Sequence, residues 1–146
     1  MSKDEILKIF PTIIQTSVLE NDFTEEEENC FQEYKKESAL GVLNNFTYDT
    51  NVLNNPKLTR IKNFITDKIN NYFRKVISPT SSNNEIYITQ SWITTTKPSQ
   101  RHHEHLHANS LLSGVMYLET IQDNIVIFTN PNKRLFYFEQ NFNEYN

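Results

Sequence analysis

The hydrophobic pattern changes its period once, near Pro79, and this change limits what the chain can fold into. Before Pro79, apolar residues recur at intervals of three and four, the spacing of an amphipathic helix. After it, β-branched and aromatic residues dominate from Glu85 to Thr96, as in a β-strand. A run of helices followed by a run of strands is typical of an α+β fold. The sequence therefore predicts an α+β chain, helical over about residues 1–80 and β over about residues 85–146.

The first helix is predicted by a capping box. Thr24 and Glu27 stand three residues apart, so that the hydroxyl and the carboxylate can each accept a hydrogen bond from a free backbone N–H at the helix start. A helix is expected from about Glu25 to Glu37. The side chains that it would bury are Cys30, Phe31 and Tyr34.

The second helix has the clearest signals. Asn55 can cap it, Pro56 suits its first position, and Pro79 stops it after Ser78. Its apolar residues recur at three and four positions and would face the core: Leu58, Ile61, Ile65, Ile69, Tyr72 and Val76.

Several strands are predicted around these helices. A short strand is expected within about Ile9 to Val18. It would lie at the edge of the sheet or begin near Pro11, because this proline lacks the N–H that a central strand needs. In the strand from Glu85 to Thr96, Trp92 would lie on one face and Ile93 on the other. After the break at residues 97–100 and the histidine segment, three more strands are expected: Leu112 to Glu119, Asn124 to Thr129 and Arg134 to Glu139. We expect one domain over residues 1–146.

Composition excludes several classes of function. The net charge is −4, the acid is concentrated from Glu25 to Glu28, and no basic patch indicates a nucleic-acid partner. Cys30 is the only cysteine, so the chain can form no internal disulfide and no cysteine-rich zinc site. No apolar stretch approaches the roughly 20 residues that span a bilayer. These features favour a cytoplasmic protein without a membrane partner.

All four histidines lie in one window, from His102 to His107. Imidazole is the commonest side-chain ligand for transition metals, so a cluster this dense predicts a metal site. In an extended segment alternate side chains share a face. His103, His105 and His107 would then face one way and are the candidate ligands, while His102 and Glu104 would face the other.

Three other interpretations of this window stay open. It could be an exposed polar turn, with His102 an ordinary surface residue. His102 and Glu104 could begin the two-histidine, one-carboxylate set of non-haem iron sites, but they would lie on the face opposite His105 and His107. A cupin-like metal site is less well supported, because no acid occurs in residues 108–113.

The sequence around the window resembles a family of 2-oxoglutarate and Fe(II)-dependent oxygenases found in bacteriophages and marine bacteria. The similarity is carried by Gln90-Ser91-Trp92, by the run from His103 to Leu118, and by Ile127-Phe128-Thr129-Asn130-Pro131. Phe10-Pro11-Thr12 suits an early segment of the same family. Two positions depart from its pattern: Ala108 stands where proline is usual, and Met116 where the first of two tyrosines is usual.

The resemblance implies a partial double-stranded β-helix, or jelly roll, with two helices packed on its antiparallel strands. It also implies Fe(II) and 2-oxoglutarate as cofactors and a hydroxylase activity. His105 and His107 correspond to the near ligand pair, although better-known relatives carry an acid at the second position, and His103 could replace either. Tyr117 is a candidate for a hydrogen bond to the co-substrate carboxylate, with ordinary core packing as the alternative.

Family members continue with a distal histidine and an arginine that pairs with 2-oxoglutarate. Here no histidine follows His107, and the only later arginine, Arg134, comes too soon after the motif. We therefore expect an oxygenase that lacks its C-terminal part and could be inactive, with a small-molecule co-substrate as partner. The alternative is a non-catalytic phage interaction protein of the same fold, in which an open sheet edge would let two copies pair.

Overall fold

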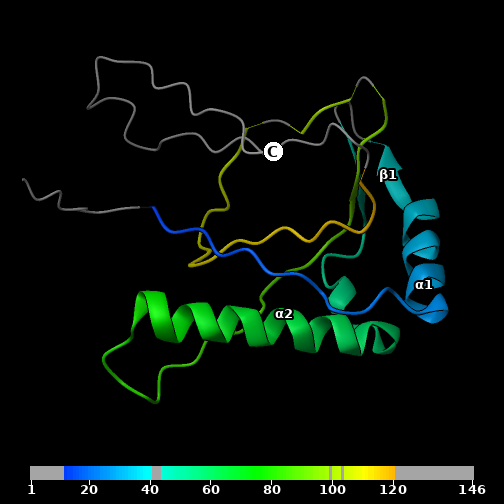
Figure 1. Ribbon diagram of the computed structural model, residues 1–146. Helices are drawn as coiled ribbons and strands as arrows, with labels where there is room; N and C mark the ends of the chain where they lie inside the picture. Colours follow the sequence, from blue (N-terminus) through cyan, green and yellow to red (C-terminus); the bar gives the residue numbers. More distant parts are fainter. Residues whose placement is uncertain (1–11, 41–43, 99, 103, 121–146) are drawn as a thin grey trace, which may run out of the picture. The chain divides into compact units, whose positions relative to one another are not determined.

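The computed structural model describes residues 12–40, 44–98, 100–102 and 104–120. These residues form two α-helices, short 3₁₀ and π-helical turns, and a small antiparallel sheet (Figure 1), so the predicted α+β class is confirmed. The chain divides into two compact units, Met1–Ala108 and Asn109–Asn146, which are described separately. The expectation of a single domain stays a prediction.

Helix α1 spans Glu25–Lys36 and begins where the capping box predicted. Thr24 Oγ1 accepts a hydrogen bond from the Glu27 N–H at 3.2 Å, and the Glu27 carboxylate accepts one from the Thr24 N–H at 2.9 Å. Cys30 and Phe31 are buried and Tyr34 is half-buried. The first helix is therefore confirmed to within one residue.

The second predicted helix is confirmed, but its two ends differ in type from its middle. It opens as the 3₁₀ turn η2, Pro56–Leu58, with the Asn55 side chain accepting a hydrogen bond from the Lys57 N–H at 3.0 Å. Helix α2 then runs over Thr59–Tyr72 and widens into the π-helical turn η3, Phe73–Ile77. There the Ser78 N–H donates to the Phe73 carbonyl five residues back, at 3.0 Å. None of the described helices is both long enough and apolar enough to cross a bilayer.

An ion pair joins the two helices across their contact. Arg60 on α2 donates two hydrogen bonds to the Glu27 carboxylate, from Nε at 3.0 Å and from Nη2 at 2.7 Å. The Glu27 side chain is only 3% exposed, while that of Arg60 is 35% exposed. The carboxylate that completes the capping box of α1 therefore also anchors α2.

Apolar side chains from both helices, from the turns next to them and from Ile93, just before β3, form the core. Each such side chain contributes about 1.5–3 kcal/mol when fully buried. Leu58 and Ile61, on the predicted apolar face of the second helix, are among the most deeply buried. The buried apolar set is Cys30, Phe31, Val52, Leu58, Ile61, Phe73 and Ile93.

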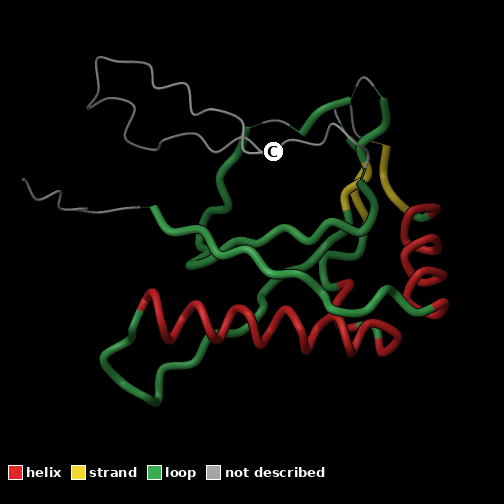
Figure 2. The backbone as a smooth tube through the Cα atoms, in the orientation of Figure 1, coloured by secondary structure: helices red, strands yellow, loops and turns green. Residues whose placement is uncertain are grey.

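The sheet contains three short strands in the order β1-β2-β3: Ser38–Leu40, Asn45–Thr47 and Thr94–Thr95 (Figure 2). All neighbours are antiparallel, and Phe46 pairs with Thr94. The Thr47 N–H donates to the Ile93 carbonyl at 3.0 Å, and both residues are buried. Within β2, Asn45 and Thr47 are buried, whereas Phe46 between them is 46% exposed. One face of this strand therefore meets the core and the other is exposed.

The predicted strand from Glu85 to Thr96 is confirmed only near its end. Thr94 and Thr95 form β3, and Ser91 makes an isolated parallel bridge to Asn51. Residues 85–90 have no strand partner among the described residues. A strand requires backbone hydrogen bonds to a neighbour, and alternation of side chains cannot supply that neighbour.

The edge strand predicted within Ile9 to Val18 is wrong for its described part, residues 12–18, which contain no strand. This segment is instead tied to α2, beside which it runs in Figure 1. Tyr72 Oη donates to the Ile13 carbonyl at 2.8 Å, and Gln15 Nε2 donates to the Lys68 carbonyl at 3.2 Å. Contacts with helix side chains and backbone hold the chain here, and no paired strand is needed.

The strand predicted from Leu112 to Glu119 is also wrong, because residues 109–120 contain no strand. An alternation of burial remains only over residues 115–118, where Met116 and Leu118 are half-buried and Val115 and Tyr117 are exposed. The alternation is present without a pairing partner in the described chain. The last two predicted strands lie outside the described residues.

Candidate metal-binding site

A tight turn leads from β3 into the histidine segment. The Lys97 N–H donates to Gln100 Oε1 at 2.8 Å, and the Gln100 N–H donates to the Lys97 carbonyl at 2.9 Å. After this turn the chain doubles back, so that the His107 ring lies 5.3 Å from the Trp92 ring, measured between centroids. The turn thereby places His107, at the end of the histidine segment, next to Trp92, which lies just before β3.

His105 and His107 point their ring nitrogens at each other. Their Nε2 atoms are 2.8 Å apart, and the ring centroids are 4.8 Å apart. A neutral imidazole has one donor and one acceptor nitrogen, so in this arrangement one ring donates to the other, and the tautomers decide which. The structure therefore brings together the two histidines whose spacing predicted a shared site, and their role as metal ligands stays a prediction.

The distance between the two nitrogens fits a shared ion. Metal–nitrogen distances to imidazole are about 2.0–2.1 Å. Two ligands in neighbouring positions of an octahedral ion would then stand roughly 3 Å apart. The observed 2.8 Å is close to this value, so small ring movements would let both Nε2 atoms bind one ion. Two imidazole nitrogens also match the histidine part of a non-haem iron site.

A complete ligand set is not present among the described residues. No three histidine, cysteine, aspartate or glutamate side chains of the described chain converge closely enough to hold an ion. His103, the third predicted ligand, lies outside the described residues. Glu104 is exposed, so the alternative set built on His102 and Glu104 gains no support from the described geometry. Among the described residues, His105 and His107 are therefore the two candidate ligands that lie together.

The predicted alternation of faces fails at His102. Strict alternation would point this ring away from His105, but the two rings stack at a centroid distance of 4.6 Å and an interplanar angle of 28°. The described residues of the window form no strand, so the period of two has no paired backbone to enforce it. His102 is exposed, as expected for a surface residue, yet it belongs to the same ring cluster as the candidate ligands.

Tyr117 belongs to the second unit, Asn109–Asn146. It lies in a segment without strand structure, and its side chain is 48% exposed. Ordinary core packing therefore does not explain this tyrosine. Its suggested role toward a co-substrate carboxylate stays a prediction.

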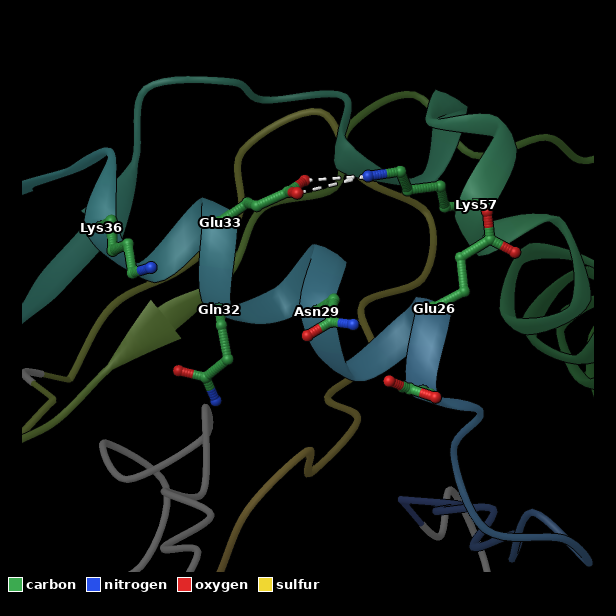
Figure 3. A pocket seen from close by; sticks show the side chains of 7 residues that line it. Glu26, Asn29, Gln32, Glu33, Lys36 and Lys57 are labelled. Atoms are coloured by element: carbon green, nitrogen blue, oxygen red, sulfur yellow. Dashed lines mark hydrogen bonds and ion pairs between the residues drawn. The ribbon is translucent and has the colours of Figure 1, made fainter.

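Other features of the described chain offer less chemistry. A hollow of about 550 Å³ lies along α1 (Figure 3), where Lys57 pairs with Glu33 at 3.0 Å. A second hollow of about 200 Å³ lies beside Tyr34 and Asn55. Both are open and lined mainly by polar side chains of a solvated helix face. Burial raises the pKa of the Cys30 thiol, which disfavours the thiolate and any nucleophilic role.

The sequence interpretation missed two contacts of this site. His102 was assigned to the opposite face, and Trp92 was assigned only to a strand face. The motif offered one signal, because Trp92 belongs to a run that accompanies the histidines in the family pattern. No local signal predicts the stacking of His102, since stacking depends on the path of an irregular loop.

The histidine pair and its aromatic neighbours lie in a part of the chain that is similar to a known family. Residues 90–146 match the family model described as "Putative 2OG-Fe(II) oxygenase". The matched part contains Trp92, His105, His107 and Tyr117. The resemblance seen in the sequence is thus confirmed for this part of the chain. No curated protein and no solved structure matches.

Proposed function

We propose that this chain carries the near ligand pair of a Fe(II)- and 2-oxoglutarate-dependent oxygenase, and that His105 and His107 hold the metal. The observation that carries the proposal is the approach of their Nε2 atoms to 2.8 Å within the segment that matches the oxygenase family. Bound Fe(II) would supply O₂ activation. The reaction would convert 2-oxoglutarate, O₂ and a C–H substrate into succinate, CO₂ and the hydroxylated product.

In this proposal the described side chains bind and orient. His105 and His107 must both be neutral, so that each directs a lone pair from Nε2 toward the ion. Formation of the site therefore exchanges the hydrogen bond between the rings for two bonds to metal. His103 is the candidate for a third ligand, and Tyr117 can donate its phenol O–H to a co-substrate carboxylate. A jelly roll is the proposed fold of the β part.

The exposure of the histidine segment supports access by small molecules. His105 is exposed and His107 is half-buried, and the intervening Leu106 is 92% exposed. Ions and a dicarboxylate can reach this segment from solvent without any opening step. The same exposure means that water surrounds the rings until a ligand displaces it.

Anaerobic titration tests the proposal directly. Fe(II) together with 2-oxoglutarate should produce a visible charge-transfer band. Fe(II) should also quench the fluorescence of Trp92, the only tryptophan, whose ring lies 5.3 Å from that of His107. Both signals should disappear in His105→Ala and His107→Ala.

Two further variants serve as controls for this titration. Leu106→Ala changes an exposed side chain between the two ligands and should leave both signals intact. Glu104→Ala should also leave both signals intact. If instead the signals are lost in Glu104→Ala and in His102→Ala but kept in the His105 and His107 variants, the alternative ligand set of His102 and Glu104 would be supported. Unchanged signals in both His105→Ala and His107→Ala would refute the proposal.

A non-catalytic interaction role is the second candidate function. The outer face of the sheet favours it, because Phe46 and the neighbouring Tyr48 are 46% and 78% exposed. In this role two copies would pair through an open sheet edge. Light scattering after size-exclusion chromatography should then show a mass that rises with concentration, and no turnover of 2-oxoglutarate to succinate should be detected.

A further inference from the structure

We propose that Trp92 and His102 are positioning residues that hold the rings of His107 and His105 in place for metal binding. This inference rests on the proposed function, because it assigns a purpose to the contacts around the same histidine pair. Neither residue is proposed to bind the ion. Each would act through the ligand that it touches.

The four rings form one continuous row. His102 stacks on His105 at 4.6 Å, His105 faces His107 at 4.8 Å, and His107 contacts Trp92 at 5.3 Å, all between ring centroids. The interplanar angles along the row are 28°, 33° and 50°. Among the described residues, each candidate ligand therefore has an outer aromatic neighbour, and the pair stands between two aromatic rings.

Such neighbours add to the contacts that orient a metal ligand. Metal-binding histidines are normally oriented by a hydrogen bond from the second ring nitrogen or by packing against a core. Here His105 is exposed and the described residues of the window form no strand. Ring stacking restricts the rotation of both imidazoles before an ion arrives, which reduces the ordering required on binding.

The chemistry of the two outer residues argues for positioning and against ligation. The Trp92 indole has an N–H donor and no acceptor nitrogen, so it cannot bind a cation through a lone pair. His102 has ring nitrogens that could in principle bind, and the substitutions below separate binding from stacking. Its observed contact with His105 is a stacked one, at 28° between the ring planes.

Substitution by phenylalanine separates the two roles of His102. Phenylalanine keeps an aromatic face and has no ring nitrogen, whereas alanine removes both. We expect His102→Ala and Trp92→Ala to weaken Fe(II) affinity by about tenfold to a hundredfold, the effect typical of residues that orient metal ligands. His102→Phe and Trp92→Phe should retain affinity close to that of the unchanged protein.

Affinity is best measured anaerobically by competition with a chromophoric chelator, because the Trp92 variants lose the fluorescent reporter. The visible spectrum of bound Co(II) gives a second readout, since disordered ligands change the coordination geometry. Tyr87→Ala removes a tyrosine that is 78% exposed and serves as the aromatic control, expected to change neither readout. Far-UV circular dichroism verifies that each variant remains folded, and the exposed His102 keeps the test available if Trp92→Ala unfolds.

The outcomes separate this inference from the proposed function. If Trp92→Ala and His102→Ala bind Fe(II) as the unchanged protein does while His105→Ala does not, the positioning role is wrong and the oxygenase proposal stands. If His102→Phe binds as weakly as His102→Ala, stacking is not the cause and His102 is a ligand. If His105→Ala and His107→Ala both bind normally, the proposed function itself fails.

Discussion

The helical region and the histidine segment are held together in opposite ways. In the helical region, from Thr24 to Ser78, caps and buried side chains fix the backbone, and Leu58 and Ile61 are almost fully buried. In the histidine segment the rings contact one another at the surface, and its described residues form no strand. The difference teaches that the first region carries the buried contacts that stabilise the fold, whereas the proposed metal chemistry would rest on side chains at the surface.

The polar side chains of the two regions differ in the same way. The Arg60 guanidinium, which donates to the Glu27 carboxylate, holds the pKa of that carboxyl below its usual value, against the opposing effect of burial. This pair is a structural one, because it joins α1 to α2 and completes a cap. The imidazoles of the histidine segment instead present nitrogen atoms near solvent, where an ion can reach them.

The largest effect on stability is expected from the helical core. Ile61→Ala removes a side chain that is 2% exposed and should lower the free energy of unfolding by about 3–4 kcal/mol, because it leaves a cavity between packed elements. Urea denaturation followed by circular dichroism measures this loss. Ile65→Ala, one turn later and only half-buried, should cost clearly less. Equal losses for the two variants would contradict the idea that the core depends more on the buried Ile61 than on the half-buried Ile65.

The next effect is expected at the ion pair. Glu27→Ala should destabilise the protein by about 2–4 kcal/mol, since it removes a capping box and the carboxylate partner of Arg60, whose Nη2 would keep its hydrogen bond to the Asp22 carbonyl. The loss should stay below that of a fully buried pair because Arg60 is 35% exposed. Glu28→Ala, on the same helical turn but exposed, is the matched control and should cost less than about 0.5 kcal/mol. Thermal and urea unfolding give both values.

A smaller effect should appear as a pH dependence of the same pair. The folded pKa of Glu27 lies below its usual value of 4.5, so its stabilisation is present above that value and is lost as the pH falls through the folded pKa. The difference in unfolding free energy between the unchanged protein and Glu27→Gln should therefore be largest near neutral pH and shrink in acid. Urea denaturation over a series of pH values tests this. A difference that stays constant would mean that Glu27 is not the titrating group.

The smallest effect on stability is expected in the histidine segment. His102→Ala and His105→Ala should each change the free energy of unfolding by less than about 0.5 kcal/mol in the absence of metal, because both side chains are exposed. The same variants should weaken Fe(II) binding strongly. A loss of stability comparable to that of Ile61→Ala would contradict the separation of the two regions.

Local signals predicted the helices well and the strands poorly. The box at Thr24 and Glu27 and the pair Asn55-Pro56 fix helix starts through hydrogen bonds between near neighbours in the chain. The strand expected from Glu85 to Thr96 depends on distant partners, and only Thr94 and Thr95 form a ladder. Helices satisfy their own backbone, whereas strands must find a neighbour that the sequence pattern does not name.

By itself, the sequence determined the helix starts, the burial of Leu58 and Ile61 on the second helix, and the approach of His105 to His107. Each of these depends on residues a few positions apart. The burial of Phe73 was not predicted, and Ile65, Ile69, Tyr72 and Val76 are only half-buried. The tertiary structure decided that Arg60 forms an ion pair with Glu27, thirty-three positions away, and that the ring of Trp92 contacts that of His107. It also turned the ring of His102 onto that of His105, against the strand alternation. Such contacts join residues that are distant in the sequence. They depend on the path of the turns and loops between those residues, because only that path brings the side chains close together.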